Sequence, residues 1–138
     1  MNTITIRFDG GCRPTNPGNK YGSYSVHLDD VEIFKASRIE LGFGTNNEAE
    51  FESLLSALKW TVENMAVGGF SPSEYTLKMY SDSMILVNRI NGRNKTRKSE
   101  PQRRMFDLSA KCLAYCSMFK VFDIEWNGRE HNVARFGH

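Results

Sequence analysis

The sequence predicts an α/β protein built on a mixed sheet of five strands that is flanked by helices. Three strand-like segments come first, and the earliest shows strict alternation of Ile4, Ile6 and Phe8 with polar residues. Two later strand-like segments are separated by stretches in which apolar residues recur at helical spacing. Hairpin-linked strands pair antiparallel and helix-linked strands pair parallel. We therefore expect a sheet that is antiparallel at one side and parallel at the other.

The first strand is expected over residues 3–8. It ends at Asp9, and the glycines Gly10 and Gly11 then let the backbone turn. Residues 13–20 contain two prolines, two asparagines and a glycine, which indicates a loop.

The remaining elements follow from periodicity and from Gly, Pro and Asn boundaries. Strands are expected at 21–28, 31–41 (joined to the preceding strand by Asp29-Asp30 as a hairpin), 75–81 and 120–126. Helices are expected from an N-cap at Asn46 or Asn47 to Gly68-Gly69, at 84–90 and at 101–118, with one or two helical turns within 128–138.

Composition limits the class of protein. A chain of 138 residues with 40% hydrophobic and 25% charged residues is expected to form one domain over residues 1–138. No apolar run is long enough for a membrane span, and Met1–Ile4 shows no secretion signal. Three cysteines fit a reduced protein, so we expect a cytoplasmic location.

The net charge of +2 says little about partners, but its distribution is uneven. The segment from Arg89 to Arg104, both ends included, contains seven basic residues and one acidic residue, Glu100. This segment is either a solvated loop with a helix start or a patch that contacts the phosphates of a nucleic acid.

Three carboxylates are placed where a fold can bring them together. Asp9 and Asp82 each follow a strand, and Glu50 lies near the buried face of the next helix, one turn from its start. Grouped carboxylates repel one another unless a cation joins them, and oxygen-only ligands favour Mg²⁺ or Mn²⁺. Two such ions about 4 Å apart activate water and stabilise the leaving oxygen of a phosphodiester. Taken singly, the three residues also fit a turn (Asp9), a helix cap (Asp82) and an arginine ion pair (Glu50).

Four motifs in a fixed order resemble ribonuclease H type 1. They are Asp9-Gly10-Gly11, Thr45-Asn46-Asn47-Glu48-Ala49-Glu50, Ser81-Asp82-Ser83 and the segment from Trp126 to Asn132. The resemblance covers nearly the whole chain. It implies a five-stranded sheet of order 3-2-1-4-5, antiparallel across 3-2-1 and parallel across 1-4-5.

The resemblance also implies roles for individual residues. Asp9, Glu50 and Asp82 match the catalytic, metal-binding carboxylates, which take Mg²⁺ or Mn²⁺, with two ions when substrate is bound. The RNA–DNA hybrid is the implied partner. The matched substrate contacts are Asn16 and Asn46 on the RNA strand and Thr45 at a DNA phosphate. Arg93 and Lys95 are expected along the DNA strand, and Gly10 and Gly11 are further expected substrate contacts.

The chain departs from the family at its fourth acidic position. Family members continue Asn-x-x-Ala-Asp, whereas Arg135 or Phe136 stands where that aspartate is expected. Asn132 and His138 are the remaining candidates for a fourth metal ligand, and His131 lies near the family's product-release histidine. We expect a monomer. The last helix is also short, which makes a homo-oligomer through this short C-terminal region the alternative.

These observations favour an endonuclease that cuts the RNA strand of RNA–DNA hybrids and leaves 5′-phosphate and 3′-hydroxyl ends. The alternative is a hybrid-binding or nucleic-acid-binding module with an impaired active site, which the absent fourth acid favours. A third reading, an integrase-type transferase, requires a different acidic spacing in the C-terminal part.

Overall fold

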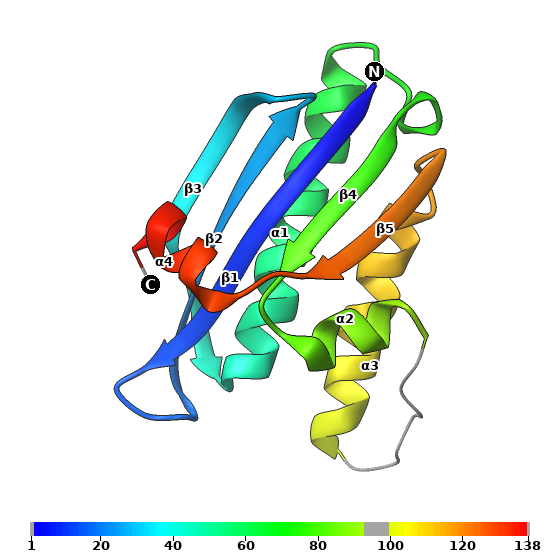
Figure 1. The fold of residues 1–138 in the computed structure, drawn as a ribbon. Helices are drawn as coiled ribbons and strands as arrows, with labels where there is room; N and C mark the ends of the chain where they lie inside the picture. Colours follow the sequence, from blue (N-terminus) through cyan, green and yellow to red (C-terminus); the bar gives the residue numbers. More distant parts are fainter. Residues whose placement is uncertain (1, 93–99, 138) are drawn as a thin grey trace.

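A computed structural model describes residues 2–92 and 100–137, with the side chains of Glu100, Pro101 and Gln102 left undescribed. Its centre is a five-stranded sheet of order β3-β2-β1-β4-β5, in which β1 is antiparallel to β2 and parallel to β4 (Figure 1). This order and these directions confirm the predicted mixed sheet. The strands are β1 (Thr3–Arg13), β2 (Gly18–Leu28), β3 (Val31–Gly44), β4 (Thr76–Ser81) and β5 (Val121–Trp126).

Helices lie on both faces of the sheet. The helices α1 and α3 cover one face, α2 lies near the end of β4, and α4 crosses the other face (Figure 1). Their bounds are α1 (Asn46–Val67), α2 (Met84–Ile90), α3 (Glu100–Cys116) and α4 (Arg129–Phe136), and a short 3₁₀ turn spans Pro72–Glu74. No helix in the described ranges combines the length and hydrophobicity that a bilayer span requires.

The core lies between the sheet and α1. Ile4, Ile6 and Phe8 of β1 point toward this helix and are at most 3% exposed, which confirms the alternation read from the sequence. Leu54 and Leu58 of α1 pack against them and are fully buried. This contact fixes the position of α1 over β1, and with it the position of the residues in the first turn of α1.

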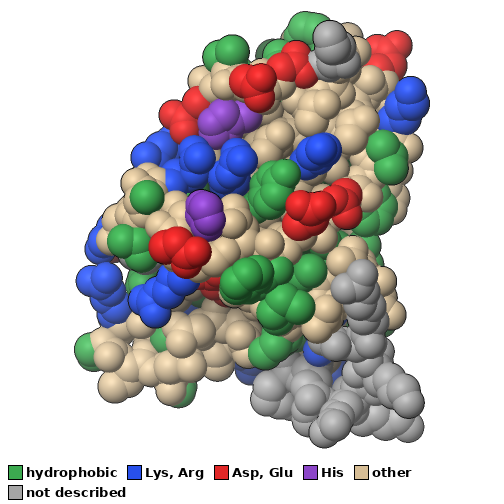
Figure 2. Space-filling view, in the orientation of Figure 1, with side chains coloured by type: hydrophobic (Ala, Val, Ile, Leu, Met, Phe, Trp, Pro, Cys, Tyr) green, Lys and Arg blue, Asp and Glu red, His purple; other side chains and the backbone are tan. Residues whose placement is uncertain are grey.

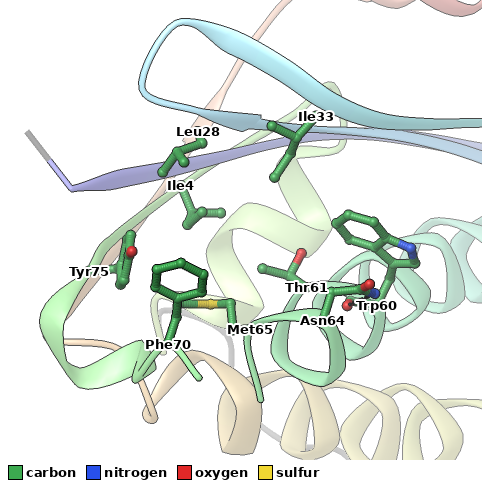
Figure 3. A pocket seen from close by; sticks show the side chains of 9 residues that line it. All are labelled: Ile4, Leu28, Ile33, Trp60, Thr61, Asn64, Met65, Phe70 and Tyr75. Atoms are coloured by element: carbon green, nitrogen blue, oxygen red, sulfur yellow. Dashed lines mark hydrogen bonds between the residues drawn. The ribbon is translucent and has the colours of Figure 1, made fainter. Parts of the chain in front are cut away.

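At the end of β1 away from Asp9 and Asp82, the core borders a small pocket of about 160 Å³ (Figure 3). Its lining is mostly apolar and includes Trp60, Met65 and Phe70. The hydroxyl of Thr61 donates to the Ala57 carbonyl, so this polar group is already satisfied by its own helix. Asn64 and Tyr75 are further polar residues of the lining.

The predicted end of the first strand was wrong. β1 continues through Asp9, Gly10 and Gly11 to Arg13, and both glycines pair with β2. The glycines serve a close approach here, because a Cβ on Gly10 would lie 2.5 Å from the carbonyl carbon of Ala49. The predicted turn is therefore a continuous strand with a helix packed directly on it.

The cap predicted for α1 at Asn46 or Asn47 was also wrong, and the alternative role of Asp82 as a helix cap is not supported. Thr45, one residue before Asn46, caps α1 and forms a capping box with Glu48. Ser83 caps α2 through its hydroxyl, which leaves the Asp82 side chain out of the cap. The other predicted boundaries lie within about three residues of those observed, a usual margin for helix and strand ends.

Candidate active site

The structure gathers Asp9, Glu50 and Asp82 into one cluster. Their ligand oxygens all lie within 4.8 Å of one another. Asp9 and Asp82 meet because β1 and β4 are parallel neighbours that remain paired as far as Arg7 and Tyr80, two residues before each aspartate. Glu50 reaches the same place from α1, one turn after the start of that helix.

The contact between α1 and β1 brings Glu50 to Asp9. A Cβ on Gly10 would lie 2.5 Å from the Ala49 carbonyl and 2.8 Å from the Glu50 nitrogen. Only glycine therefore lets the first turn of α1 approach the strand this closely. The capping box fixes where that turn begins, since the Thr45 hydroxyl accepts from the Glu48 nitrogen at 3.2 Å.

Burial makes the cluster electrostatically expensive. Asp9 is 6% exposed and Glu50 is 8% exposed. Burial, followed by the charges of Asp9 and Asp82, raises the pKa of Glu50 well above its ordinary value. The oxygen Oε2 of Glu50 is buried and has no hydrogen-bond partner among the described residues. No ion pair with an arginine was found for Glu50 among them either, so the arginine alternative is not supported.

The donor set fits a hard divalent cation. It consists of carboxylate oxygens, one of which is an unpartnered buried acceptor. Oxygen ligands of this kind suit Mg²⁺, Mn²⁺ or Ca²⁺ rather than softer metals. A bound cation would relieve the mutual repulsion that otherwise raises the pKa of Glu50.

Helix α4 brings two further residues to the cluster. Asn132 is 7% exposed, and its side chain is hydrogen-bonded to that of Asp82. Arg129 lines the same pocket as the three carboxylates. Burial and the charge of Asp9 raise the pKa of Asp82, and the contact with Asn132 and the charge of Arg129 oppose this rise. Arg129 was not predicted as a site residue, although its spacing of three from Asn132 places both on one helix face.

The other C-terminal candidates lie elsewhere. Arg135 points to β3, where its Nη1 is 3.9 Å from a carboxylate oxygen of Glu32. His131 is exposed on α4 beside Glu130 and lines a different pocket from the carboxylates. His138 lies outside the described residues. Of the predicted fourth-position residues that are described, Asn132 is thus the one beside the carboxylates.

The two asparagines predicted to contact sugar hydroxyls lie together at the start of α1. Asn16 Oδ1 accepts from the backbone nitrogen of Asn46 at 3.1 Å. Asn46 Oδ1 accepts from the backbone nitrogen of Cys12 at 2.9 Å and lies 3.2 Å from its thiol sulfur. Cys12 was not predicted, and it connects β1 to both asparagines. Gly11, beside it, lines the carboxylate pocket, as does Asn46.

Thr45 borders a neighbouring groove whose lining includes two arginines. Arg89 of α2 and Arg104 of α3 line this groove with Thr45 and Asn16. Arg104 Nη1 lies 3.4 Å from Glu48 Oε2, so it is tethered to the capping box of α1. The predicted DNA-strand residues Arg93 and Lys95 lie outside the described residues.

The fold, together with a carboxylate cluster at the junction of β1, α1 and β4, resembles that of ribonuclease H domains. The chain is similar in structure to ribonuclease H and RNase H1 domains over nearly its whole length. No family model matches the chain.

Three comparisons carry this likeness. The N-terminal RNase H domain of Rv2228c from Mycobacterium tuberculosis, solved as a fusion with maltose binding protein, has a TM-score of 0.75 and 26% identity, covering 95% of this chain and 91% of that one. LC11-RNase H1 in complex with an RNA/DNA hybrid has a TM-score of 0.73 and 24% identity. The match covers 97% of this chain and 91% of that one. The bifunctional protein Rv2228c of Mycobacterium tuberculosis is 28% identical over 131 residues. That match covers 94% of this chain and 32% of the relative, so the chain spans about a third of the length of the curated relatives it matches.

Proposed function

We propose that this chain is an endonuclease that hydrolyses the RNA strand of RNA–DNA hybrids and leaves 5′-phosphate and 3′-hydroxyl ends. The observation that carries the proposal is the convergence of Asp9, Glu50 and Asp82 within 4.8 Å, just beyond the point where the parallel pairing of β1 and β4 ends. The likeness to an RNase H1 solved with an RNA/DNA hybrid supports the choice of substrate. The proposal treats residues 1–138 as one RNase H-like domain.

Each carboxylate has a role that follows from its position. Asp9 lies within β1 and Asp82 directly follows β4, so the sheet holds both backbones, and the two aspartates would hold Mg²⁺ or Mn²⁺ through fixed oxygens. When bound, such ions lower the pKa of water and stabilise charge on a phosphate. Glu50, whose pKa is raised by burial and by the charges of Asp9 and Asp82, would orient the attacking water and the neighbouring 2′-hydroxyl.

The groups around the cluster suit recognition of an RNA strand. Asn16, Asn46 and Cys12 form a polar edge beside the carboxylates, and short polar side chains are what distinguishes a 2′-hydroxyl from a deoxyribose. Arg89 and Arg104 line the next groove, where they would contact phosphates of the DNA strand. Asn132 would supply the fourth ligand, with His138 or water as the other sources.

The decisive experiment is cleavage of a labelled RNA–DNA hybrid with Mg²⁺ and, separately, with Mn²⁺. We expect the wild type to cut the RNA strand and Asp9→Asn to lose the cleavage. The matched control is Asp30→Asn, which alters an exposed aspartate in the β2–β3 turn. End-labelling of the products tests for the 5′-phosphate. Cleavage that persists in Asp9→Asn would contradict the proposal.

One observation favours a second candidate function. Asn132, beside Asp82, contributes no charge to the cluster, which therefore has three carboxylates and the nearby Arg129. A site with fewer negative charges holds cations less tightly, as expected of a hybrid-binding module without catalysis. Salt-sensitive hybrid binding by the wild type without cleavage in either metal would establish this second function.

A further inference from the structure

The sheet face opposite α1 carries a row of polar and cationic residues. Tyr24 and Val26 of β2 point into the core, so Ser25 between them points to the opposite face. In the strand register, Ser25 lies between Arg7 of β1 and Lys35 of β3. A hydroxyl group therefore lies between two cationic side chains on this face.

Helix α4 adds a third cation to the same place. A pocket between α4 and the sheet is lined by Arg7, Lys35 and Arg135, with the exposed Glu130 and His131 of α4 also in its lining. Figure 2 shows Lys and Arg side chains gathered on this face of the molecule. His27 lies two residues after Ser25 on the same face of β2. Burial, followed by the charges of Arg135 and Arg7, lowers the pKa of His27, so both guanidinium groups act on this part of β2.

These cations are incompletely paired. Glu32 is shared between Arg135, at 3.9 Å, and His27, at 4.0 Å. Arg7 lies over the ring of Tyr80, 4.9 Å from its centroid, and Lys35 donates to the backbone carbonyl of Arg135 at 2.7 Å. Within residues 2–92 and 100–137, neither Arg7 nor Lys35 forms an ion pair with a carboxylate.

Two buried donors lie at the same place without partners. Ser25 is fully buried, and its Oγ has no hydrogen-bond partner among the described residues. The Nε of Arg135 is likewise buried and unpartnered there. Buried polar atoms are normally hydrogen-bonded, so two orphans next to three cations indicate a place prepared for an acceptor-rich anion.

We propose that Arg7, Lys35 and Arg135, with Ser25 beneath them, form a binding site for a phosphate group. Guanidinium groups present paired donors that match phosphate oxygens, and a phosphate has enough acceptors to engage three cations at once. The site goes beyond the proposed hydrolysis, because its pocket shares no residue with the carboxylate pocket. The phosphate comes either from a nucleic-acid strand or from a free phosphate compound.

Inorganic phosphate is the first probe. It is titrated into metal-free protein at constant ionic strength, with binding measured by calorimetry and by the shift of the Ser25 amide resonance. We expect Arg7→Gln and Arg135→Gln each to weaken binding by about tenfold or more, since each removes charged hydrogen bonds. Lys78→Gln is the matched control, because Lys78 is an exposed cation one register position from Arg7 on the same face. Equal affinity in the wild type and in both arginine variants, or no binding by the wild type, overturns the proposal.

Ser25→Ala is a second variant, used in case the arginine variants fail to fold. It removes the orphan hydroxyl without changing charge, and circular dichroism confirms the fold before titration. We expect a smaller loss of phosphate affinity, of about threefold to tenfold, from the loss of one neutral hydrogen bond. A Ser25 amide that does not move during the titration of folded wild-type protein would also overturn the site.

A single-stranded oligonucleotide distinguishes the two sources of phosphate. If a nucleic-acid backbone is the ligand, Arg7→Gln and Arg135→Gln weaken oligonucleotide binding and lower its salt dependence by about one charge each. If a free phosphate compound is the ligand, only the affinity for inorganic phosphate falls. Either result supports the site and identifies its source.

Discussion

Replacing Glu50 by glutamine should stabilise the metal-free protein and weaken its response to Mg²⁺. The carboxylate of Glu50 is buried against those of Asp9 and Asp82, and its oxygen Oε2 has no partner among the described residues. An amide of the same shape removes one negative charge and donates hydrogen bonds to the two aspartates. Loss of the proposed function should therefore accompany a gain in stability.

The magnitude follows from the spacing of the oxygens. At 4.8 Å and an effective dielectric constant of about 20, two ionised carboxylates repel each other by about 3 kcal/mol. The wild type avoids part of this cost by taking up a proton, because the pKa of Glu50 is raised. We therefore expect a gain of about 1–3 kcal/mol in the free energy of unfolding, or roughly 4–12 °C in Tm.

The assay is thermal or urea unfolding in EDTA and then in increasing Mg²⁺. A cation at ten times its Kd stabilises the wild type by about 1.4 kcal/mol, and we expect a smaller effect in Glu50→Gln. Glu63→Gln is the matched control, because Glu63 is an exposed glutamate on the same helix. It should leave both the stability and the Mg²⁺ response unchanged.

The difference in stability between the wild type and Glu50→Gln should depend on pH. A carboxyl group whose pKa is raised by folding binds protons more tightly in the folded state, so its contribution to stability falls as pH rises. The loss begins near the ordinary pKa of 4.5 and continues up to the raised pKa of the folded protein. The advantage of metal-free Glu50→Gln should therefore grow from pH 4.5 upward. A variant less stable than the wild type at neutral pH in EDTA, with Glu63→Gln neutral, would refute the electrostatic reasoning.

Three substitutions test the framework around the cluster. Thr45→Ala should cost about 1 kcal/mol in urea unfolding because it removes the α1 cap, and an unchanged free energy would mean that the capping box is not formed in solution. Gly10→Ala should lower the free energy of unfolding by about 1–3 kcal/mol because the new Cβ meets the Ala49 backbone. It should also reduce the Mg²⁺-induced rise in Tm. A variant as stable as the wild type would contradict the close packing. Lys20→Met breaks the ion pair with Glu52 and should lower the free energy of unfolding by about 2–3 kcal/mol. Breaking a fully buried pair costs roughly 3–5 kcal/mol, and the cost is smaller here because the Glu52 side chain is 27% exposed. Adding Glu52→Leu should recover part of that loss, because it removes the unpaired charge.

Much of the fold could be predicted because its signals are local. The short helix Met84–Ile90 was predicted at its observed bounds, and the hairpin at Asp29-Asp30 joins β2 to β3 as expected. In these two cases the periodicity of a segment and its connection type were sufficient. The convergence of Asp9 and Asp82 also required β1 and β4 to be neighbours, and that strand order came from the resemblance to ribonuclease H type 1.

The two wrong boundaries arose where one pattern has two physical meanings. Gly10-Gly11 fits a turn as well as a strand that must approach a helix closely, and only the position of Ala49 decides between them. The cap at Thr45 was different, because Thr45 and Glu48 have the spacing of a capping box and could have been read directly. Asn46 was preferred as the cap on residue preference alone.

The contribution of α4 depends on tertiary contacts that no local pattern encodes. Phe136 is buried, and Lys35 and Arg38 of β3 donate to the carbonyls of Arg135 and Gly137 at the end of the helix. These contacts fix the rotation of α4 over the sheet. That rotation turns Asn132 toward Asp82 and Arg135 away from it.

The arrangement of α4 separates the roles of the carboxylates. Burial and neighbouring negative charge raise the pKa of both Glu50 and Asp82, but only Asp82 has Asn132 and Arg129 opposing the rise. Under the proposed function, Asp82 would therefore be favoured as an ionised metal ligand, and Glu50 would more readily take up a proton when no cation is bound. A fourth carboxylate in place of Asn132 would add repulsion to Asp82 and remove this difference. The neutral amide at the fourth position thus leaves the pKa of Asp82 less raised by like charge than a carboxylate there would.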